Sequence, residues 1–297
     1  MTTPTQTGDS LSGFFYALAA YLLWGFLPLY MKALADVPAA EVVAHRVIWS
    51  VPVALAVLAW LGRTADLKAA LKSPRMLAMA AATAALVSAN WGIYVWAIIS
   101  GHALDAALGY YINPLFSIFL GAVLLGERLR GIQWLAILCA AIAVAILTWE
   151  TGRLPLVALG LTLTWGVYAY LKRRLPIGPN QGFALEVLLL LPLALAYAGW
   201  LGLSGQSHFT SEGAATTVLL VVIGLVTAGP LMLYANGAKR LRLSTIAIMQ
   251  YLTPTMIFLV AVFLFDEPFS RIRLAAFGFI WVAMVIYSAS MLQRTRS

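Results

Sequence analysis

Apolar residues dominate this chain in long runs, and short charged clusters separate one run from the next. Each run is about as long as the roughly 20 residues that a helix needs to cross the hydrocarbon layer. The runs lack the polar stripe of a soluble helix, and barrel strands would be shorter and alternating. We therefore predict ten membrane-spanning helices, over residues 12–34, 40–62, 75–99, 103–125, 131–149, 154–172, 180–202, 216–238, 243–265 and 272–292.

Composition supports a membrane protein and excludes a soluble domain. Of the 297 residues, 62% are hydrophobic and only 10% are charged, with a mean hydropathy of +0.90. Ordinary globular domains carry about 25% charged residues, so this chain has too few polar residues to cover a water-facing surface. The polar start, residues 1–10, has no basic n-region and no small-residue cleavage site, so we expect no signal peptide.

The chain also repeats itself at an offset of about 140 residues. The recurring features, in the same order in both halves, are Trp24-Gly25 and Trp165-Gly166, Tyr111-Ile112-Asn113-Pro114 and Tyr251-Leu252-Thr253-Pro254, and Glu127 and Glu267. Shared apolar bias makes membrane segments alike, but the common order favours duplication. Each half holds five spans, and an odd number inverts the second copy. We therefore predict an all-α membrane protein of two inverted five-helix repeats, residues 1–150 and 151–297.

The net charge of +8 fits a membrane topology better than a nucleic-acid partner. If the N-terminus lies inside, most basic residues fall on the cytoplasmic side. These are Arg63, Lys68, Lys72, Arg75, Arg128, Arg130, Lys172, Arg173, Arg174, Lys239, Arg240, Arg242, Arg294 and Arg296. The outer side then holds Lys32, Arg153, Arg271 and Arg273. Because this bias is the positive-inside signal, we predict a multi-pass protein of the cell inner membrane with both termini in the cytoplasm.

The sequence carries no pattern typical of an enzyme, a metal site or a cofactor site. It has no His-Glu-x-x-His helix, no carboxylate pair within one span, no Ser/Lys dyad within a span and no P-loop. The histidines, His45, His102 and His208, are too scattered to suggest a metal site. The single Cys139 excludes an intramolecular disulfide. We expect no cofactor and no catalytic residue.

Two tryptophans lie near the middle of their predicted spans. Trp24 and Trp165 are repeat-equivalent, and each is followed by a glycine, Gly25 and Gly166. Interface-anchoring tryptophans lie near span ends, so these need another role. They line a substrate cavity or its gates, with the glycines as hinges, or they simply pack between helices.

A second group of candidates lies in the spans at 75–99 and 216–238. Tyr94 and Tyr234 are repeat-equivalent, and Asn90 precedes Tyr94 by four residues, on the same helical face. An asparagine inside a membrane is costly unless it finds a hydrogen-bond partner. It binds substrate, or it joins two helices.

The densest polar segments flank two repeat-equivalent prolines. They contain Tyr110, Tyr111, Asn113 and Pro114 in the first half, and Gln250, Tyr251, Thr253 and Pro254 in the second. Each proline removes a backbone donor and leaves a carbonyl to be satisfied by neighbours or cavity water. We favour kinks here that open a cavity and present polar side chains to substrate. The alternative is that Asn113 and Thr253 only cap the freed backbone.

Two charges lie inside spans, at repeat-equivalent positions. Arg46 and Glu186 each lie about six residues, or roughly 9 Å, from the span start, on opposite sides of the membrane, so no direct ion pair is expected. Both are candidates for proton or charge coupling. Alternatively, Arg46 reaches the outer interface together with His45. Glu127 and Glu267 close their spans, and we expect them to be solvated or to form salt bridges.

Four stretches carry a family resemblance: residues 44–50 (AHRVIWS), 90–91 (NW), 108–115 (LGYYINPL) and 125–129 (LGERL). They resemble the RarD-like permeases of the EamA-type branch of the drug/metabolite transporter superfamily, to which the YddG-type amino-acid exporters also belong. The resemblance covers nearly the whole chain and is strongest over residues 12–150. It implies a ten-helix inner-membrane carrier whose central cavity is lined by the first, third, fourth, sixth, eighth and ninth helices.

We expect a secondary transporter that exports small neutral or zwitterionic metabolites by alternating access. The candidates are aromatic or neutral polar, which suits aromatic or large neutral amino acids, because rings stack on rings and ammonium groups lie against their faces. A chloramphenicol-type drug permease of the same fold stays open, as do, in other classes, a membrane-embedded enzyme and a channel. The expected partners are a small-molecule substrate and the lipid bilayer, not nucleic acid. A monomer is plausible, and the oligomeric state stays open.

Overall fold

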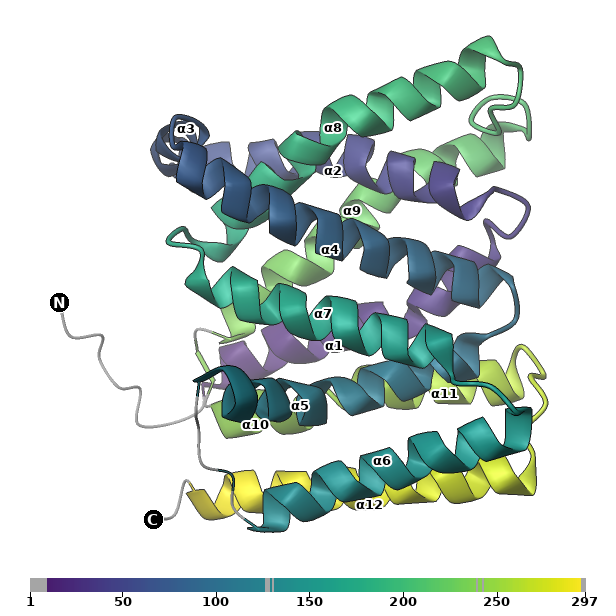
Figure 1. Cartoon of the computed structure of the whole chain (residues 1–297). Coiled ribbons are helices and arrows are strands. Elements are labelled where there is room, and N and C mark those ends of the chain that lie inside the picture. Colours follow the sequence, from purple (N-terminus) through teal and green to yellow (C-terminus); the bar gives the residue numbers. More distant parts are fainter. Residues whose placement is uncertain (1–9, 126–128, 130, 239, 242, 295–297) are drawn as a thin grey trace, which may run out of the picture. The chain divides into compact units, whose positions relative to one another are not determined.

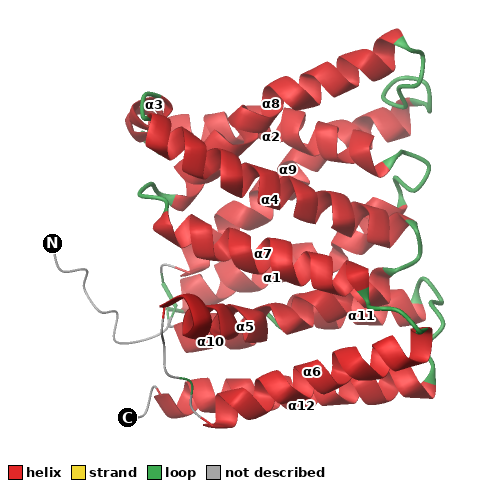
Figure 2. Cartoon of the chain, viewed as in Figure 1, coloured by secondary structure: helices red, strands yellow, loops and turns green. Residues whose placement is uncertain are grey.

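Helices are the regular structure of the part that the computed structural model describes, which comprises residues 10–125, 129, 131–238, 240–241 and 243–294. Those ranges contain no strand (Figure 2). The helices, labelled in Figure 1, are α1 (Leu11–Lys32), α2 (Ala39–Trp60), α3 (Thr64–Leu71), α4 (Pro74–Ile99), α5 (Ala103–Leu125), α6 (Gly131–Thr151), α7 (Leu156–Arg174), α8 (Pro179–Leu203), α9 (Ala214–Ala238), α10 (Leu243–Met249), α11 (Leu252–Phe263) and α12 (Arg271–Arg294).

Seven of the described helices are long and apolar enough to cross a membrane, namely α1, α2, α4, α6, α8, α9 and α12. Shorter apolar stretches lie in α7 (Leu156–Lys172) and α11. The chain is therefore a multi-pass, all-α membrane protein. Apart from the span predicted at 243–265, each predicted span coincides with one helix to within about two residues at either end.

The structure differs from the prediction at 243–265, where α10 and α11 divide the span. Pro254 has no N–H to donate to the carbonyl of Gln250, so the helix loses that hydrogen bond at the site of the break. The helix is accordingly interrupted at Gln250 and Tyr251 and resumes at Leu252. The equivalent Pro114 lies inside the unbroken α5. The short α3 was not predicted, and it buries only Leu67 and Ala70.

Contacts divide the chain into two compact units. Unit 1 comprises Met1–Pro28, Gly101–Gly166 and Asn236–Ser297, and unit 2 comprises Leu29–Ser100 and Val167–Ala235. Each unit combines helices from both predicted repeats. A compact unit is therefore not a repeat, and the repeat boundaries stay a prediction.

Unit 1 is built on two helix pairs from opposite halves of the chain. The pairing of α6 with α12 is the most extensive, and both run side by side in Figure 1; α5 packs against α11. The buried positions of α6 include Ala136, Ala140 and Ala143, and small residues at this spacing allow close helix approach. Aromatic rings fill the core, with Phe277 5.0 Å from Phe258 between ring centroids.

Unit 2 is built around α8, against which α2, α4 and α3 pack. The helices approach closely at Gly224 in α9, where an added methyl group would lie 2.2 Å from the backbone of Trp49 in α2. Only glycine fits there, because no movement of a flexible side chain would relieve the contact. The tight crossing fixes α2 and α9 to one another and brings Arg46, on α2, within reach of α9.

Candidate functional site

The aromatic candidates of unit 1 meet where α5 faces the break between α10 and α11. The rings of Tyr111 and Tyr251 stack, with centroids 6.3 Å apart. The hydroxyl of Tyr111 forms a 2.8 Å hydrogen bond with that of Thr255, which also donates to the carbonyl of Tyr251. Tyr111 is 1% exposed and also contacts Phe277 edge-on, so its ring is part of the core of unit 1.

Two polar atoms in this part of unit 1 are buried without a hydrogen-bond partner among the described residues. They are the hydroxyl of Tyr251 and the side-chain oxygen of Asn113. Their neighbours Tyr110 and Gln250 are half-buried. A buried polar group without a partner is costly, and such groups mark sites where water or a ligand binds.

Thr253 binds a backbone carbonyl of another helix, and not the carbonyl of Gln250, to which Pro254 has no N–H to donate. Its hydroxyl donates to the carbonyl of Tyr21 in α1 at 3.0 Å. Tyr21 in turn lies 5.9 Å from Trp24 between ring centroids, and its hydroxyl donates to the carbonyl of Ile246 at 3.5 Å. The structure therefore connects Thr253 to Trp24 through Tyr21, all within unit 1.

The two repeated glycines lie at close helix crossings. A methyl group at Gly25 would lie 2.5 Å from the sulfur of Met256, and one at Gly166 would lie 2.4 Å from the ring of Phe116. Both helices run unbroken through these glycines. The adjacent Trp24 and Trp165 are half-buried. The glycines thus serve the close approach of helices.

In unit 2, the candidates on α4 are buried. Asn90 and Tyr94 are 1% and 3% exposed, and Tyr234 on α9 is half-buried. Trp91, beside Asn90, is also buried and carries the guanidinium of Arg46 over its ring, 4.6 Å from the centroid. The polar face predicted on α4 therefore points into the protein.

Arg46 does not reach for the outer interface. It is 4% exposed, its Nε donates to the hydroxyl of Thr227 at 3.2 Å, and its cationic plane covers Trp91. His45 separates from it, stacking on Phe209 with centroids 4.7 Å apart. Of the two alternatives for Arg46, the structure contradicts the one in which it snorkels with His45, because a hydroxyl and an aromatic face hold the guanidinium inside unit 2.

Glu186 is fully buried and forms an ion pair. Its Oε1 lies 2.6 Å from Nζ of Lys172, and its Oε2 accepts a 3.3 Å hydrogen bond from the hydroxyl of Tyr168. Lys172, which we predicted among the cytoplasmic charges, lies in the last turn of α7 with its side chain directed to α8. As predicted, the partner of Glu186 in the structure is not Arg46.

A second buried carboxylate, Glu41, fixes the loop between α8 and α9 to α2. It accepts hydrogen bonds from the backbone N–H of His208 at 2.8 Å and from the hydroxyl of Ser207 at 3.2 Å, and it contacts Nδ1 of His208 at 2.7 Å. Phe209 of the same loop covers His45 and Trp49. Three adjacent loop residues are thereby seated on one helix.

Glu267 is neither solvated nor paired with a neighbouring arginine, contrary to our expectation. It is buried, and its two oxygens accept from the backbone N–H groups of Ala103 at 2.6 Å and Leu104 at 2.9 Å. It thus caps the first turn of α5, where unsatisfied N–H groups and the helix dipole favour an anion. Its repeat counterpart Glu127 lies outside the described residues.

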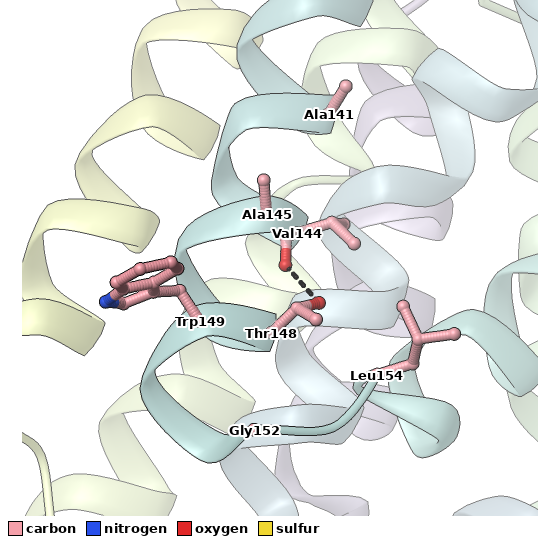
Figure 3. Close-up of a pocket in the computed structure, with 7 residues that line it drawn as sticks. All are labelled: Ala141, Val144, Ala145, Thr148, Trp149, Gly152 and Leu154. Carbon is pink, nitrogen blue, oxygen red and sulfur yellow. Dashed lines mark hydrogen bonds between the residues drawn. The ribbon is translucent and has the colours of Figure 1, made fainter.

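A groove on the surface of unit 1 follows α6 and the loop after it. Figure 3 shows its lining side chains, with the hydroxyl of Thr148 bonded to the carbonyl of Val144. Trp149 stands outward at its edge and is 89% exposed. None of the predicted site residues lines this groove, and its apolar, outward face suits contact with lipid.

The buried charged residues Glu186 and Arg46 were identified from the sequence, but the residues that they contact were not. Lys172 and Tyr168 are spaced four apart, and so are Gly182 and Glu186, so each pair shares a helix face. That double spacing is the one sequence signal for the Lys172–Glu186 pair. The partner of Arg46, Thr227, lies 181 residues away and leaves no local signal.

Comparison with known proteins gives one family. Residues 11–149 match the EamA-like transporter family. An uncharacterized transporter of Vibrio cholerae is 41% identical over 98% of this chain and 96% of its own length. Protein RarD of Salmonella typhi is 40% identical, over 93% of this chain and 94% of that protein.

Two further similarities concern a more distant relative and the fold. Chloramphenicol-sensitive protein RarD of Pseudomonas aeruginosa is 34% identical over 92% of each chain. A crystal structure of a protein 20% identical in sequence superposes with a TM-score of 0.61, over 93% of this chain and 96% of the other. At that identity the superposition supports the fold alone.

Proposed function

Since the chain belongs to the EamA-like transporter family and is RarD-like, we propose that it is a ten-helix secondary carrier that moves small neutral or zwitterionic solutes out of the cell by alternating access. The ten spans comprise the seven long apolar helices together with α5, α7 and the α10–α11 segment. Both termini lie in the cytoplasm, and the membrane is the inner one, following the distribution of basic residues.

Equivalent contacts between equivalent helices carry this proposal. The extensive pairs α6–α12, α2–α8 and α5–α11 each join a helix to its own counterpart in the other half. A two-fold axis brings equivalent elements together in this way. The close crossings agree, because Gly25 and Gly166 are counterparts, and so are the residues they meet, Met256 and Phe116. Inverted repeats of this kind are the usual frame of secondary carriers.

For the substrate we propose an aromatic or large neutral amino acid. The proposed contacts are Trp24, Asn90, Tyr94, Tyr110, Tyr111, Asn113, Trp165, Tyr234, Gln250, Tyr251 and Thr253. Asn113 and Tyr251 have the firmest support, because each buries a polar atom that no described residue satisfies. The second candidate is a chloramphenicol-type drug, favoured by the printed name of the Pseudomonas relative.

Counterflow in proteoliposomes tests the function. Vesicles are preloaded with a panel of amino acids and given labelled tryptophan or phenylalanine outside. We expect saturable uptake, reduced at least about tenfold in Trp165→Ala, a loss of roughly 1.4 kcal/mol of binding. Trp149→Ala is the matched control, because its indole is 89% exposed on the groove of α6.

Two outcomes would contradict the proposal at different levels. Folded protein that exchanges no amino acid but exchanges chloramphenicol would replace the substrate class and keep the carrier. Modification of solute by detergent-solubilised protein, without any sealed membrane, would instead indicate an enzyme.

A further inference from the structure

The environment of Glu186 shows how its charge is compensated. The side chain is 0% exposed in the first third of α8, yet the ammonium of Lys172 lies 2.6 Å away, and the hydroxyl of Tyr168 donates to its other oxygen at 3.3 Å. Lys172 also lies over the ring of Tyr168, 5.5 Å from the centroid. One face of α7 therefore supplies both partners of the carboxylate.

The helix surface of α8 is shaped to receive the lysine. Gly182 lies one turn before Glu186, and a methyl group there would lie 3.1 Å from Nζ of Lys172 and 3.3 Å from its Cε. A larger residue would compete with the end of the lysine side chain. The side chain of Lys172 thus passes over Gly182 on the surface of α8 and reaches the carboxylate of Glu186.

The other charged and titratable groups on neighbouring helices have their own contacts or lie elsewhere. On α3, the carboxylate of Asp66 accepts a 3.0 Å hydrogen bond from Gln181 of α8. On α2, Arg46 contacts Thr227 and Trp91. The remaining groups on these helices are Glu41 and His45 on α2, Lys68 on α3, and Arg75 and Tyr94 on α4. Lys172 is the cation that the structure places against Glu186.

A buried carboxylate has two ways to avoid an uncompensated charge: it binds a proton, or it pairs with a cation. Removing one member of a buried ion pair is costly because the other charge stays behind, whereas replacing both by neutral groups is often nearly neutral. Because the ammonium of Lys172 lies 2.6 Å from Glu186, this carboxylate is paired with a cation. In a proton- or cation-coupled carrier, a buried carboxylate binds an ion from solution. Here the ammonium of Lys172 takes the place of that ion.

We propose that Lys172 is the built-in counter-ion of Glu186, so that the carboxylate stays ionised and solute moves without a coupled proton. The inference rests on the proposed carrier function for its second part only. It identifies Glu186 as a fixed, internally neutralised charge instead of a proton carrier. It makes the solute's own gradient the driving force.

Infrared spectroscopy of the purified full chain tests the first part without any substrate. Wild-type protein should show no carboxylic-acid C=O band at neutral pH that Glu186→Gln removes. Lys172→Met should gain such a band, because the isolated carboxylate takes up a proton, and Lys172→Met/Glu186→Gln should lose it again. A wild-type band that disappears in Glu186→Gln would show a protonated carboxyl and overturn the proposal.

Counterflow of labelled phenylalanine tests the second part. Wild-type rates should not change with an imposed pH gradient. Lys172→Met should fall at least about tenfold at neutral pH and become dependent on the gradient, since breaking a buried pair costs several-fold more than removing it whole. The double variant should return to within about threefold of wild type. Lys68→Met, an exposed lysine of α3, is the control.

The two parts fail separately. If the double variant is as inactive as Lys172→Met while Lys68→Met is active, the charge itself takes part in the cycle and the counter-ion role is wrong. If wild-type protein exchanges no amino acid, the proposed substrate fails, chloramphenicol replaces phenylalanine as the probe, and the infrared result still decides the state of Glu186.

Discussion

The two units bury different chemistry. In unit 2, the described buried charges each contact another element: Glu186 pairs with α7, Arg46 binds α9, and Glu41 holds the α8–α9 loop. In unit 1, the described core is made of rings and hydroxyls such as Tyr111, and its buried carboxylate, Glu267, binds backbone N–H groups. Charges cost more than hydroxyls when a partner is lost. Single substitutions should therefore damage unit 2 more than unit 1.

The largest effect should come from Glu41→Ala in unit 2. The change removes the acceptor for Ser207 and for both the N–H and the ring of His208, so the loop loses its attachment to α2. We expect a loss of about 3 kcal/mol in the free energy of unfolding. Denaturant unfolding in detergent, followed by circular dichroism, measures it.

Glu212→Ala in the same loop is the control for that experiment, because Glu212 is exposed. A loss below about 1 kcal/mol in Glu41→Ala, the level of a surface charge, would remove the contrast between the units.

A smaller effect is expected from Glu267→Ala in unit 1. The variant leaves the N–H groups of Ala103 and Leu104 without their acceptor and removes an anion from the N-terminus of α5. Loss of a helix cap costs typically about 1 kcal/mol, and burial raises this to about 2. The neighbouring Asp266→Asn should change little, since Asp266 is exposed and asparagine tolerates its φ of 51°. Equal unfolding midpoints for the two variants would rule out the cap.

The sequence predicted the helices well because span length is a local property. A run of apolar residues must cross a fixed thickness of lipid, so its ends are set by the run itself. The break before Pro254 was likewise foreseeable as a kink, since proline removes the hydrogen bond to the carbonyl four positions before it. The unbroken passage of α5 through Pro114 was not, because it depends on neighbours.

The partners of the buried charges were not predictable in the same way. Lys172 reads as a cytoplasmic loop residue until α7 and α8 close their hairpin and bring it across Gly182. Glu41 reads as a residue at a helix end, and it becomes buried because a distant loop folds over it. Such contacts arise from tertiary packing. A single sequence therefore shows which charged residues lie within apolar segments, but it does not show which residues they contact.

Within unit 1, Tyr111→Phe measures what a hydrogen bond between two uncharged side chains contributes to stability. The hydroxyl of Tyr111 bonds to that of Thr255, which keeps its bond to the carbonyl of Tyr251 when the phenol is lost. We expect a loss of about 1 kcal/mol in unfolding free energy, the usual contribution of a neutral hydrogen bond. A loss above about 3 kcal/mol in unfolding free energy would be as large as the loss expected for a buried charge in unit 2, and it would contradict the difference between the units.

Tyr251→Phe should have the smallest effect on stability and a real one on transport. Tyr111 has Thr255 as partner, but the position equivalent to Thr255 in the first half is Leu115, which offers Tyr251 no hydroxyl. The phenol oxygen of Tyr251 is buried with no partner among the described residues, so removing it should change the unfolding free energy by less than about 0.5 kcal/mol. If the hydroxyl instead binds solute, phenylalanine counterflow should fall about fivefold, equivalent to one lost hydrogen bond. A variant as active as wild type would mean that the unsatisfied oxygen meets only water, and the binding site would then have to be sought away from the break between α10 and α11.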